Sequence, residues 1–382
     1  MTLISRSDRG ALARWWFTVD KLLLTCVLLL MAAGVIVNLA ASPTIAARLG
    51  LEPFHFFDRH LAYLVPAALI LLFTSFLDER NARWTALAVL IIGLILMVAT
   101  LMVGAEVKGA RRWIDFGIVN LQPSEFVKPA FVVIAAWLLG ERTKRPDVPG
   151  HAIAVALFTI ILSLLILQPD FGQAALLSAV FAIMLVAYGL AWTMLMGLGA
   201  LALAGLAFAY QAFPHVASRI DRFLSPDTGD TFQVDTALQA FYNGGIFGTG
   251  PGGGTAKRIL PDAHADFIFS VLGEEFGFLA GIVLVLLFAF IVMRVLLRSL
   301  EERDAFSALA LAGLISVFGL QAIINMAVNL SLMPAKGMTL PFISYGGSSL
   351  LSMAFAMGLV LVFGRRRPRT ELSSPVAGGQ LS

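Results

Sequence analysis

The residues best suited to chemistry lie where one very apolar segment begins, in the stretch RILPDAHADFIFSVLGEEFG (258–277). It contains Asp262, His264, Asp266, Glu274 and Glu275, and it continues as FLAGIVLVLLFAFIVM, which is typical of a membrane-spanning helix. Charge beside a lipid-soluble helix is costly, so ionisable residues there are candidates for function. Carboxylates in this position could cap a helix or take part in chemistry.

Asp266 is the strongest candidate of the group, because helix capping can account for Asp262 but not for Asp266. If a helix starts near Pro261, Asp262 is a natural N-cap and Asp266 lies one turn inside. Positions 266, 270, 273 and 277 then share a face, and the last three are serine or glycine. We expect this face to admit another helix or a substrate. Glu274 and Glu275 are expected near the membrane interface, in either a structural or a functional role.

Four basic residues could bind phosphate: Arg111, Arg112, Lys128 and Lys336. Lys128 follows Glu125 by three residues, which places both on one helix face as a structural ion pair or as part of a site. The two arginines precede a tryptophan and could anchor the chain at the membrane interface. Their planar guanidinium groups suit phosphate oxygens equally well.

Prolines precede four apolar segments, and proline suits the first turn of a helix. Four ordinary helix starts explain them, but four N-termini with free N–H groups could also face one anionic ligand. The prolines are Pro123, Pro169, Pro261 and Pro341.

Other polar residues near the segment ends are candidates for a supporting role. Asp170 could equally cap the helix that follows it. The candidates are Gln122, Gln168, Asp170, His264, Ser344 and Tyr345.

Composition identifies an integral membrane protein: 59% of the 382 residues are hydrophobic, 13% are charged, and the mean hydropathy is +0.87. The net charge of +3 is dispersed between apolar runs, which argues against nucleic-acid binding. The single cysteine, Cys26, excludes an intramolecular disulfide. No histidine pair has metal-ligand spacing, so no metal site is predicted, and there is no P-loop.

The hydropathy pattern predicts an all-α integral membrane protein with ten transmembrane helices and one long extracytoplasmic loop between helices 7 and 8. The first apolar run lacks the processing site of a cleaved signal and is expected to span. The predicted spans are 20–41, 60–77, 84–104, 122–139, 152–168, 170–189, 192–211, 266–293, 306–330 and 340–363.

Lysine and arginine counts predict that both termini are cytoplasmic, with about 16 basic residues on the inner segments and about 10 on the outer ones. Residues 1–19 and 364–382 are then cytoplasmic tails, the second disordered, around a single membrane domain at 20–363. The extracytoplasmic loop covers about 213–265, and its "VDTALQAF" segment has a weak apolar face that suits a membrane surface. Nearly every unusual polar stretch faces the outer side.

Five stretches together resemble the SEDS family of bacterial inner-membrane peptidoglycan glycosyltransferases: "KGARRWI", "LQPSEFVKP", "QPDFGQ", "LPDAHADFIFSVLGEEFG" and "LPFISYGGSSLL". The resemblance runs from about residue 20 to 363. "MPAKGMTLPFISYGGSSLL" is more similar to the cell-division member than to the elongation member, mainly because of Lys336. The chain departs from the family's pattern at Asp262, Ala265 and Gly253, which puts only loop contacts and substrate fine-tuning in doubt.

The resemblance implies that the protein polymerises lipid II outside the membrane, at the division septum, with Asp266 as the essential acidic residue. A sugar hydroxyl of one lipid II would attack the anomeric carbon of another with inversion, and undecaprenyl pyrophosphate would leave. The four basic residues named above would stabilise that pyrophosphate, with Glu125 orienting Lys128. A divalent cation could assist, although the sequence identifies no ligands for it. The implied partners are a class B penicillin-binding transpeptidase and other divisome membrane proteins.

Three other roles fit parts of the pattern. An elongation polymerase shares the same motifs. A lipid II flippase would also place charged residues within spans, but it needs a polar path to the inner side, where ionisable residues are scarce. A non-catalytic scaffold of the division machinery would need no general base.

Overall fold

The structure is a computed structural model that describes residues 10–365 apart from 108–109, 116, 118–119, 146, 213–216, 218–220, 222–231 and 335–336. It is predominantly α-helical. Its helices are α1 (Ala11–Thr18), α2 (Lys21–Arg48), α3 (His55–Phe76), α4 (Glu79–Val103), α5 (Pro123–Lys144), α6 (Gly150–Leu167), α7 (Phe171–Tyr188), α8 (Trp192–Ala212), α10 (Phe232–Gly244), η2 (Ala256–Arg258), α11 (Ile268–Glu301), α12 (Ala305–Asn329) and α13 (Gly347–Phe363).

Each of the ten predicted spans overlaps one of these helices. Within the described part of the chain, eight helices are long and apolar enough to cross a membrane: α2 to α7, α11 and α12. Helix α13 is apolar but has 17 residues, because the chain does not become helical until Gly347. The expected start of the last span at 340 is therefore wrong by seven residues, and residues 340–346 form an irregular segment before the helix.

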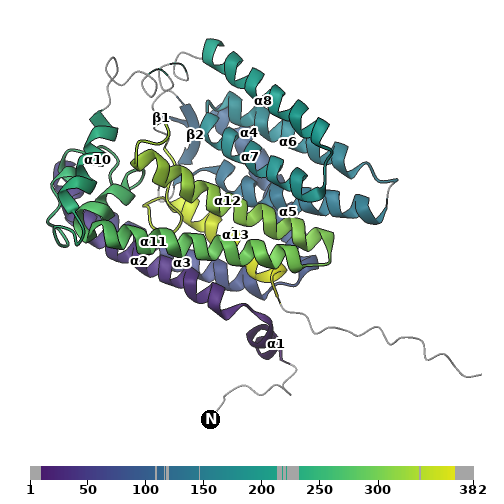
Figure 1. The fold of residues 1–382 in the computed structure, drawn as a ribbon, viewed down its shortest axis with the longest axis horizontal. Helices are drawn as coiled ribbons and strands as arrows, with labels where there is room; N and C mark the ends of the chain where they lie inside the picture. Colours follow the sequence, from purple (N-terminus) through teal and green to yellow (C-terminus); the bar gives the residue numbers. More distant parts are fainter. Residues whose placement is uncertain are drawn as a thin grey trace, which may run out of the picture.

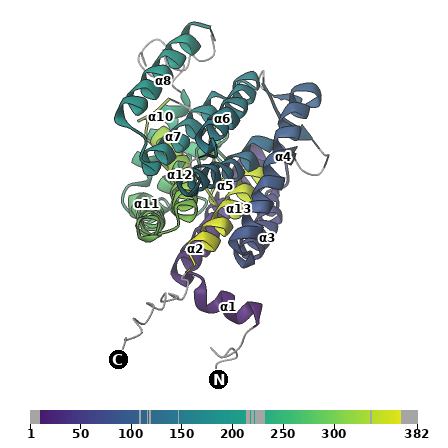
Figure 2. The same ribbon diagram turned by 90° about the vertical axis from the view of Figure 1, so that its right-hand side faces the viewer.

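The long helices run side by side, and α5, α12 and α13 lie at the centre of the bundle (Figures 1 and 2). Their burial agrees with this arrangement, since every residue of α13 after Leu351 is buried and 78% of the apolar window of α12 is buried. In contrast, only 22% of the apolar window is buried in α3 and in α6. These two helices expose apolar side chains such as Phe73 and Leu167, as helices facing lipid do.

A small antiparallel sheet departs from the expected all-α fold. It consists of β1 (Ala105–Val107), β2 (Ala110–Asp115) and β3 (Asn120–Leu121), in the order β1-β2-β3. Trp113 of β2 pairs with Ala105, and Ile114 pairs with Leu121. Hydropathy could not reveal strands this short, but the sheet matters because it leads directly into α5 and places the two arginines of β2.

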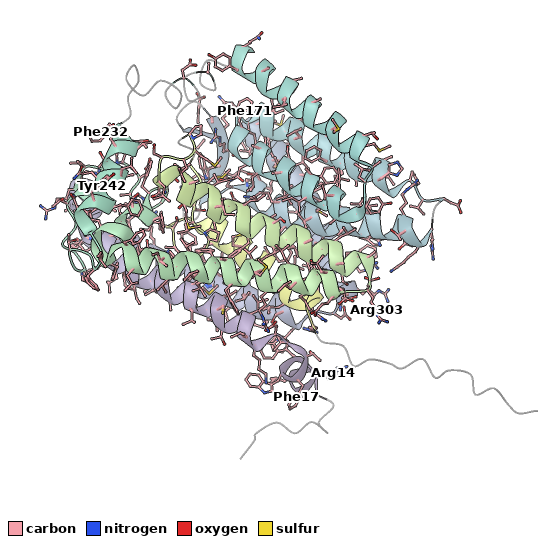
Figure 3. All side chains as sticks on the ribbon, in the orientation of Figure 1. Arg14, Phe17, Phe171, Phe232, Tyr242 and Arg303 are labelled. Atoms are coloured by element: carbon pink, nitrogen blue, oxygen red, sulfur yellow. The ribbon has the colours of Figure 1, made fainter. Side chains whose placement is uncertain are left out.

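The bundle has two distinct ends. Phe232 and Tyr242 of α10 lie at one end and Arg303, between α11 and α12, lies at the other (Figure 3). The "VDTALQAF" segment lies within α10. The glycine tract, residues 243–258, begins in the last turn of α10 and lies at the same end. We call this the α10 end of the bundle.

The glycine tract packs against a break in α11. Gly277 has φ 81° and ψ 174°, which divides α11 into a short first part and a long second part. A helix break inside a bundle leaves backbone groups that need partners. Four hydrogen bonds of 2.9 to 3.2 Å supply them: the N–H groups of Phe278 and Leu279 donate to the carbonyls of Gly245 and Ile246, and the N–H groups of Thr249 and Gly250 donate to the carbonyls of Glu274 and Glu275.

Replacing Gly277 with alanine is expected to disrupt this junction. Its backbone conformation is accessible essentially to glycine alone, and an added Cβ would collide with backbone atoms of Gly248, Ile246 and Phe247. We expect Gly277→Ala to lower the free energy of unfolding by about 3 kcal/mol or more. Thermal unfolding of the purified protein in detergent measures this change.

Gly281→Ala is the matched control, because an added Cβ there would meet only the Phe269 ring at 3.8 Å. In a helix interior that substitution should be neutral or stabilising by up to about 1 kcal/mol. Equal unfolding midpoints for the two variants would contradict the proposed role of the break.

Candidate functional site

Asp266 lies in a turn before α11 and not within it. Residues 261–267, the carboxylate turn, are not helical, and the N-cap of α11 is Phe267. The expected helix start near Pro261 is therefore wrong, as are the capping role of Asp262 and the shared helix face at 266, 270, 273 and 277. Asp262 has φ 51° and its carbonyl accepts the N–H groups of Ala265 and Asp266. The seven-residue turn, which periodicity could not reveal, is what sets the direction of the Asp266 side chain.

The carboxylate turn is held by the irregular segment before α13. Ser344 Oγ donates to the carbonyl of Ala265 at 2.6 Å, and the Tyr345 N–H donates to the carbonyl of His264 at 2.9 Å. Two of the predicted supporting residues thus contact the turn through its backbone. A Cβ added to Gly337 would lie 3.1 Å from Asp266 Oδ2, so the glycine leaves space for the carboxylate. Lys336 itself lies outside the described residues.

Lys128 is completely buried inside the bundle and is held by three acceptors. Its Nζ lies 2.9 Å from Glu125 Oε2, 2.6 Å from Gln173 Oε1 and 3.2 Å from Gln321 Oε1. The two glutamine contacts are hydrogen bonds and the Glu125 contact is an ion pair, so the buried ammonium has both polar and charged partners. Gln173 also donates to Glu125 Oε1 at 2.6 Å. The predicted Glu125–Lys128 contact is present, and at 3% and 1% exposure both charges depend on each other and on the two glutamines.

A second polar group lies where α6 ends and α7 begins. Asp170 accepts from its own helix at the N–H of Gln173 and from Gln122 Nε2 at 3.2 Å, and Arg112 lies 3.9 Å away. Burial raises the pKa of the Asp170 carboxyl above its ordinary value, while Arg112 and the Gln173 N–H favour its charged form. Gln168 donates to the carbonyl of Met97 and so braces the turn. Asp170 is therefore a helix cap joined to Arg112.

The two arginines of β2 have different surroundings, because alternate residues of a strand point to opposite faces. Arg112 donates to the carbonyls of Gln168 and Pro169 and approaches Asp170. Arg111 remains half exposed and pairs with Glu106 of the neighbouring strand at 3.4 Å. Only Arg112 joins the group around Asp170.

The expectation of four proline-led helix starts is largely wrong. Pro123 is the first residue of α5, as predicted. Pro169 stands two residues before α7, Pro261 seven before α11, and Pro341 six before α13. Of the four prolines, only Pro123 therefore occupies the first turn of its helix.

Glu274 and Glu275 hold the glycine tract. Glu274 Oε1 accepts the N–H groups of Thr255 and Ala256 at 2.8 and 3.0 Å, and Asn243 Nδ2 at 3.2 Å. Glu275 forms an ion pair with Lys257 in which both side chains are fully buried. Lys257 also donates to the carbonyl of Ala40 at 2.9 Å, which ties the tract to α2. Both glutamates are buried inside the protein, and their contacts are structural.

Several polar residues that the sequence analysis did not select complete the site. Gln173 and Gln321 contact Lys128, and Asn325 and Asn329 contact the carboxylate turn. Gln321, Asn325 and Asn329 recur every four residues in an otherwise apolar helix. That spacing puts them on one face, and buried amides in a membrane helix are a signal that could have identified them.

All the buried charged side chains in the described part of the chain lie within about two helical turns of the α10 end. In that same part, no group of three or more His, Cys, Asp or Glu residues is arranged to hold a metal ion. Fold and site thus define a multi-spanning membrane protein with a carboxylate and a buried cation at one end of its bundle. The chain belongs to the cell cycle protein family of FtsW, RodA and SpoVE, whose model matches residues 20–367.

Two relatives illustrate this membership. The chain is 44% identical over 365 residues to a probable peptidoglycan glycosyltransferase FtsW of Caulobacter vibrioides, covering 95% of this chain and 94% of the relative. It is 37% identical over 350 residues to a protein of the same name from Trichlorobacter lovleyi, with 90% and 92% covered.

Solved structures share the fold. One chain from a peptidoglycan synthase complex that coordinates polymerisation and crosslinking matches with a TM-score of 0.74 and 28% identity, covering 91% of this chain and 97% of that one. The crystal structure of the rod shape determining protein RodA of Thermus thermophilus matches with a TM-score of 0.67 and 28% identity, over the same shares of the two chains.

His264 gives the carboxylate turn a pH dependence. Its ring packs against those of Phe56 and Tyr345, with centroids 4.1 and 5.4 Å away, and these two rings also contact each other. Burial lowers the pKa of His264 to about 4, Asp262 opposes the shift, and Arg48 adds to it. The unfolded chain, with an ordinary pKa near 6.5, binds the proton first as pH falls. Stability is therefore full above pH 6.5 and is lost as pH falls toward 4.

We expect the wild type to lose about 2 kcal/mol more stability than His264→Gln between pH 7.5 and pH 5, because glutamine does not titrate. Thermal unfolding in detergent at both pH values measures this, and the difference between the two proteins cancels the effect of other titrating groups. Equal losses of stability in the two proteins would show that the pKa of His264 is not lowered by folding.

Proposed function

We propose that the protein is an FtsW-type peptidoglycan glycosyltransferase that polymerises lipid II on the outer face of the cytoplasmic membrane. Membership of the family and the names of the relatives support the class of enzyme. The observation that carries the proposal is the position of Asp266. It lies on a turn outside the helix ladder, against Gly337, at the end of the bundle that holds every buried charge of the described residues.

The proposed reaction uses Asp266 as the general base. A sugar hydroxyl of the acceptor loses its proton to the Asp266 carboxylate and attacks the anomeric carbon of the donor. The bond from that carbon to the pyrophosphate breaks, undecaprenyl pyrophosphate leaves, and the configuration inverts. The negative charge that develops on the pyrophosphate requires cations. Lys128 and Arg112 are the candidates that the polar network supports, together with Arg111 at the surface and Lys336 outside the described residues.

The proposed topology places the α10 end outside the cell. It includes ten spans, namely the eight selected above together with α8 and α13. Residues 1–19 and 364–382 would be cytoplasmic, and the segment at about 213–265 would be extracytoplasmic. This arrangement puts the carboxylate turn and the Lys128 network on the side where the lipid-linked sugars are joined.

A lipid II flippase is less well supported by the distribution of polar groups. A flippase needs a polar path across the membrane. Beyond about two turns from the α10 end, the side chains buried within the described part of the bundle are apolar or uncharged, as at Thr74, Ser75 and Ser316. A polymerase acts on one side only and needs no such path.

The direct test is glycan synthesis by the purified protein, with its transpeptidase partner, from labelled lipid II. We expect Asp266→Asn to lower the rate by about 100-fold or more, since general base catalysis is typically worth that much. Asp262→Asn is the matched control, because it also removes a carboxylate from the turn and asparagine tolerates the positive φ. Normal polymerisation by Asp266→Asn would remove Asp266 as the base.

The biological role is tested in cells. We propose that the protein acts at the division septum with a class B penicillin-binding transpeptidase and other divisome proteins. A functional fluorescent fusion should concentrate at the septum, and Asp266→Asn should fail to restore growth after depletion of the wild type. A dispersed sidewall pattern would support the elongation role instead, and full complementation by Asp266→Asn would support a scaffold.

A further inference from the structure

The backbone carbonyl of Asp266 is withdrawn from the hydrogen-bond ladder of α11. In a continuous helix it would accept the N–H of Ser270. That N–H donates instead to the Phe267 carbonyl at 3.1 Å and to Asn329 Oδ1 at 3.0 Å. The Asp266 carbonyl accepts from Asn325 Nδ2 and Asn329 Nδ2, each at 2.9 Å. Two side chains of α12 thus replace one bond of α11.

The contacts of Asn329 fix the orientation of its amide. A backbone N–H can only donate, so the atom facing Ser270 must be the oxygen Oδ1, which also accepts the Ser270 hydroxyl at 2.7 Å. The nitrogen Nδ2 then faces the carbonyls of Asp266 and Asn325, both at 2.9 Å. Asn329 is fully buried and uses its whole hydrogen-bonding capacity.

Asn325 joins the carboxylate turn to the segment that follows α12. Its Nδ2 donates to the Met338 carbonyl at 2.6 Å as well as to Asp266. Met338 follows Gly337, the residue beside the Asp266 carboxylate. Gln321, one turn earlier and about 6 Å along the axis, donates to the Thr339 carbonyl at 3.2 Å and accepts from Lys128. One face of α12 therefore sets the base, its surroundings and the buried cation.

We propose that Asn325 and Asn329 are positioning residues for the general base, an inference that rests on the role proposed above for Asp266. By holding the Asp266 carbonyl they prevent α11 from starting earlier. Without them, that carbonyl could accept the Ser270 N–H, and Asp266 would enter the first turn of the helix. Its side chain would then take the direction that helical geometry dictates, away from Gly337.

Stability alone does not require this arrangement. A helix that begins earlier gains its own backbone bonds, and apolar residues on α12 could pack against it without buried polar groups. Asparagine is also a poorer helix former than leucine or alanine. The two asparagines therefore select one backbone geometry at Asp266 over a simpler helical one, which is the property expected of groups that orient a base.

The test measures kcat and KM for lipid II in Asn325→Ser and Asn329→Ser, which remove the amides without adding charge. Asn329→Asp is a further variant, since it keeps an acceptor for Ser270 and, when ionised, cannot donate to Asp266. We expect kcat to fall about 10- to 100-fold, because small misplacements of a catalytic group have effects of that size. KM should stay within about twofold. Ser316→Ala, which removes a bond within α12 to Ala312, is the control and should leave kcat unchanged.

A double variant separates positioning from general packing. If the asparagines act through Asp266, Asn329→Ser should lower the residual rate of Asp266→Asn no further. An unchanged kcat in folded serine variants, or a further loss in the double variant equal to the single one, would overturn the proposal. If Asn329→Asp does not fold, the serine variants decide. A wild type that makes no glycan, or a fully active Asp266→Asn, would instead refute the proposed function.

Discussion

Polar groups buried in a membrane protein must find partners inside the protein, and this constraint governs the α10 end of the bundle. The break at Gly277 frees backbone groups of α11, and the glycine tract supplies the matching ones. Glycine is required on both sides, because a Cβ at Gly248 or Gly277 would meet backbone. The Lys257–Glu275 pair then fastens the tract to α2. A rigid support for the carboxylate turn follows from these pairings.

The same constraint shapes the two parts of the candidate site differently. At Lys128 the charge is offset by a carboxylate and two amides, so a buried cation persists inside the bundle. At Asp266 the group that needs a partner is the backbone carbonyl, and side-chain amides of α12 donate to it in place of a helical N–H. Gln321 and Asn325 belong to one face of α12, so the two parts share a single rigid element.

Sequence patterns predicted the features that depend on hydropathy and local spacing. The positions of the helices and the Glu125–Lys128 contact follow from runs of apolar residues and from helical periodicity. The carboxylate turn, the late start of α13 and the sheet could not be predicted in this way. Asp266 leaves the helix because Asn325 and Asn329, about 60 residues later, bind its carbonyl, and periodicity contains no information on such a contact. For the same reason, local spacing could not show that Asp262 lies in a turn and does not cap a helix.

The partners of Lys128 bear on how it could serve a lipid-linked pyrophosphate. Its Nζ donates hydrogen bonds to two amide oxygens and forms an ion pair with Glu125, so a phosphate oxygen would compete with these partners. A neutral amide is easier to displace than the Glu125 carboxylate, since its attraction to an ammonium is weaker. Of the two amides, Gln321 has the longer contact and can keep its bonds to Thr339 and Ser349 through Nε2. The contact between Lys128 and Gln321 is therefore the one that an anionic ligand would replace at least cost.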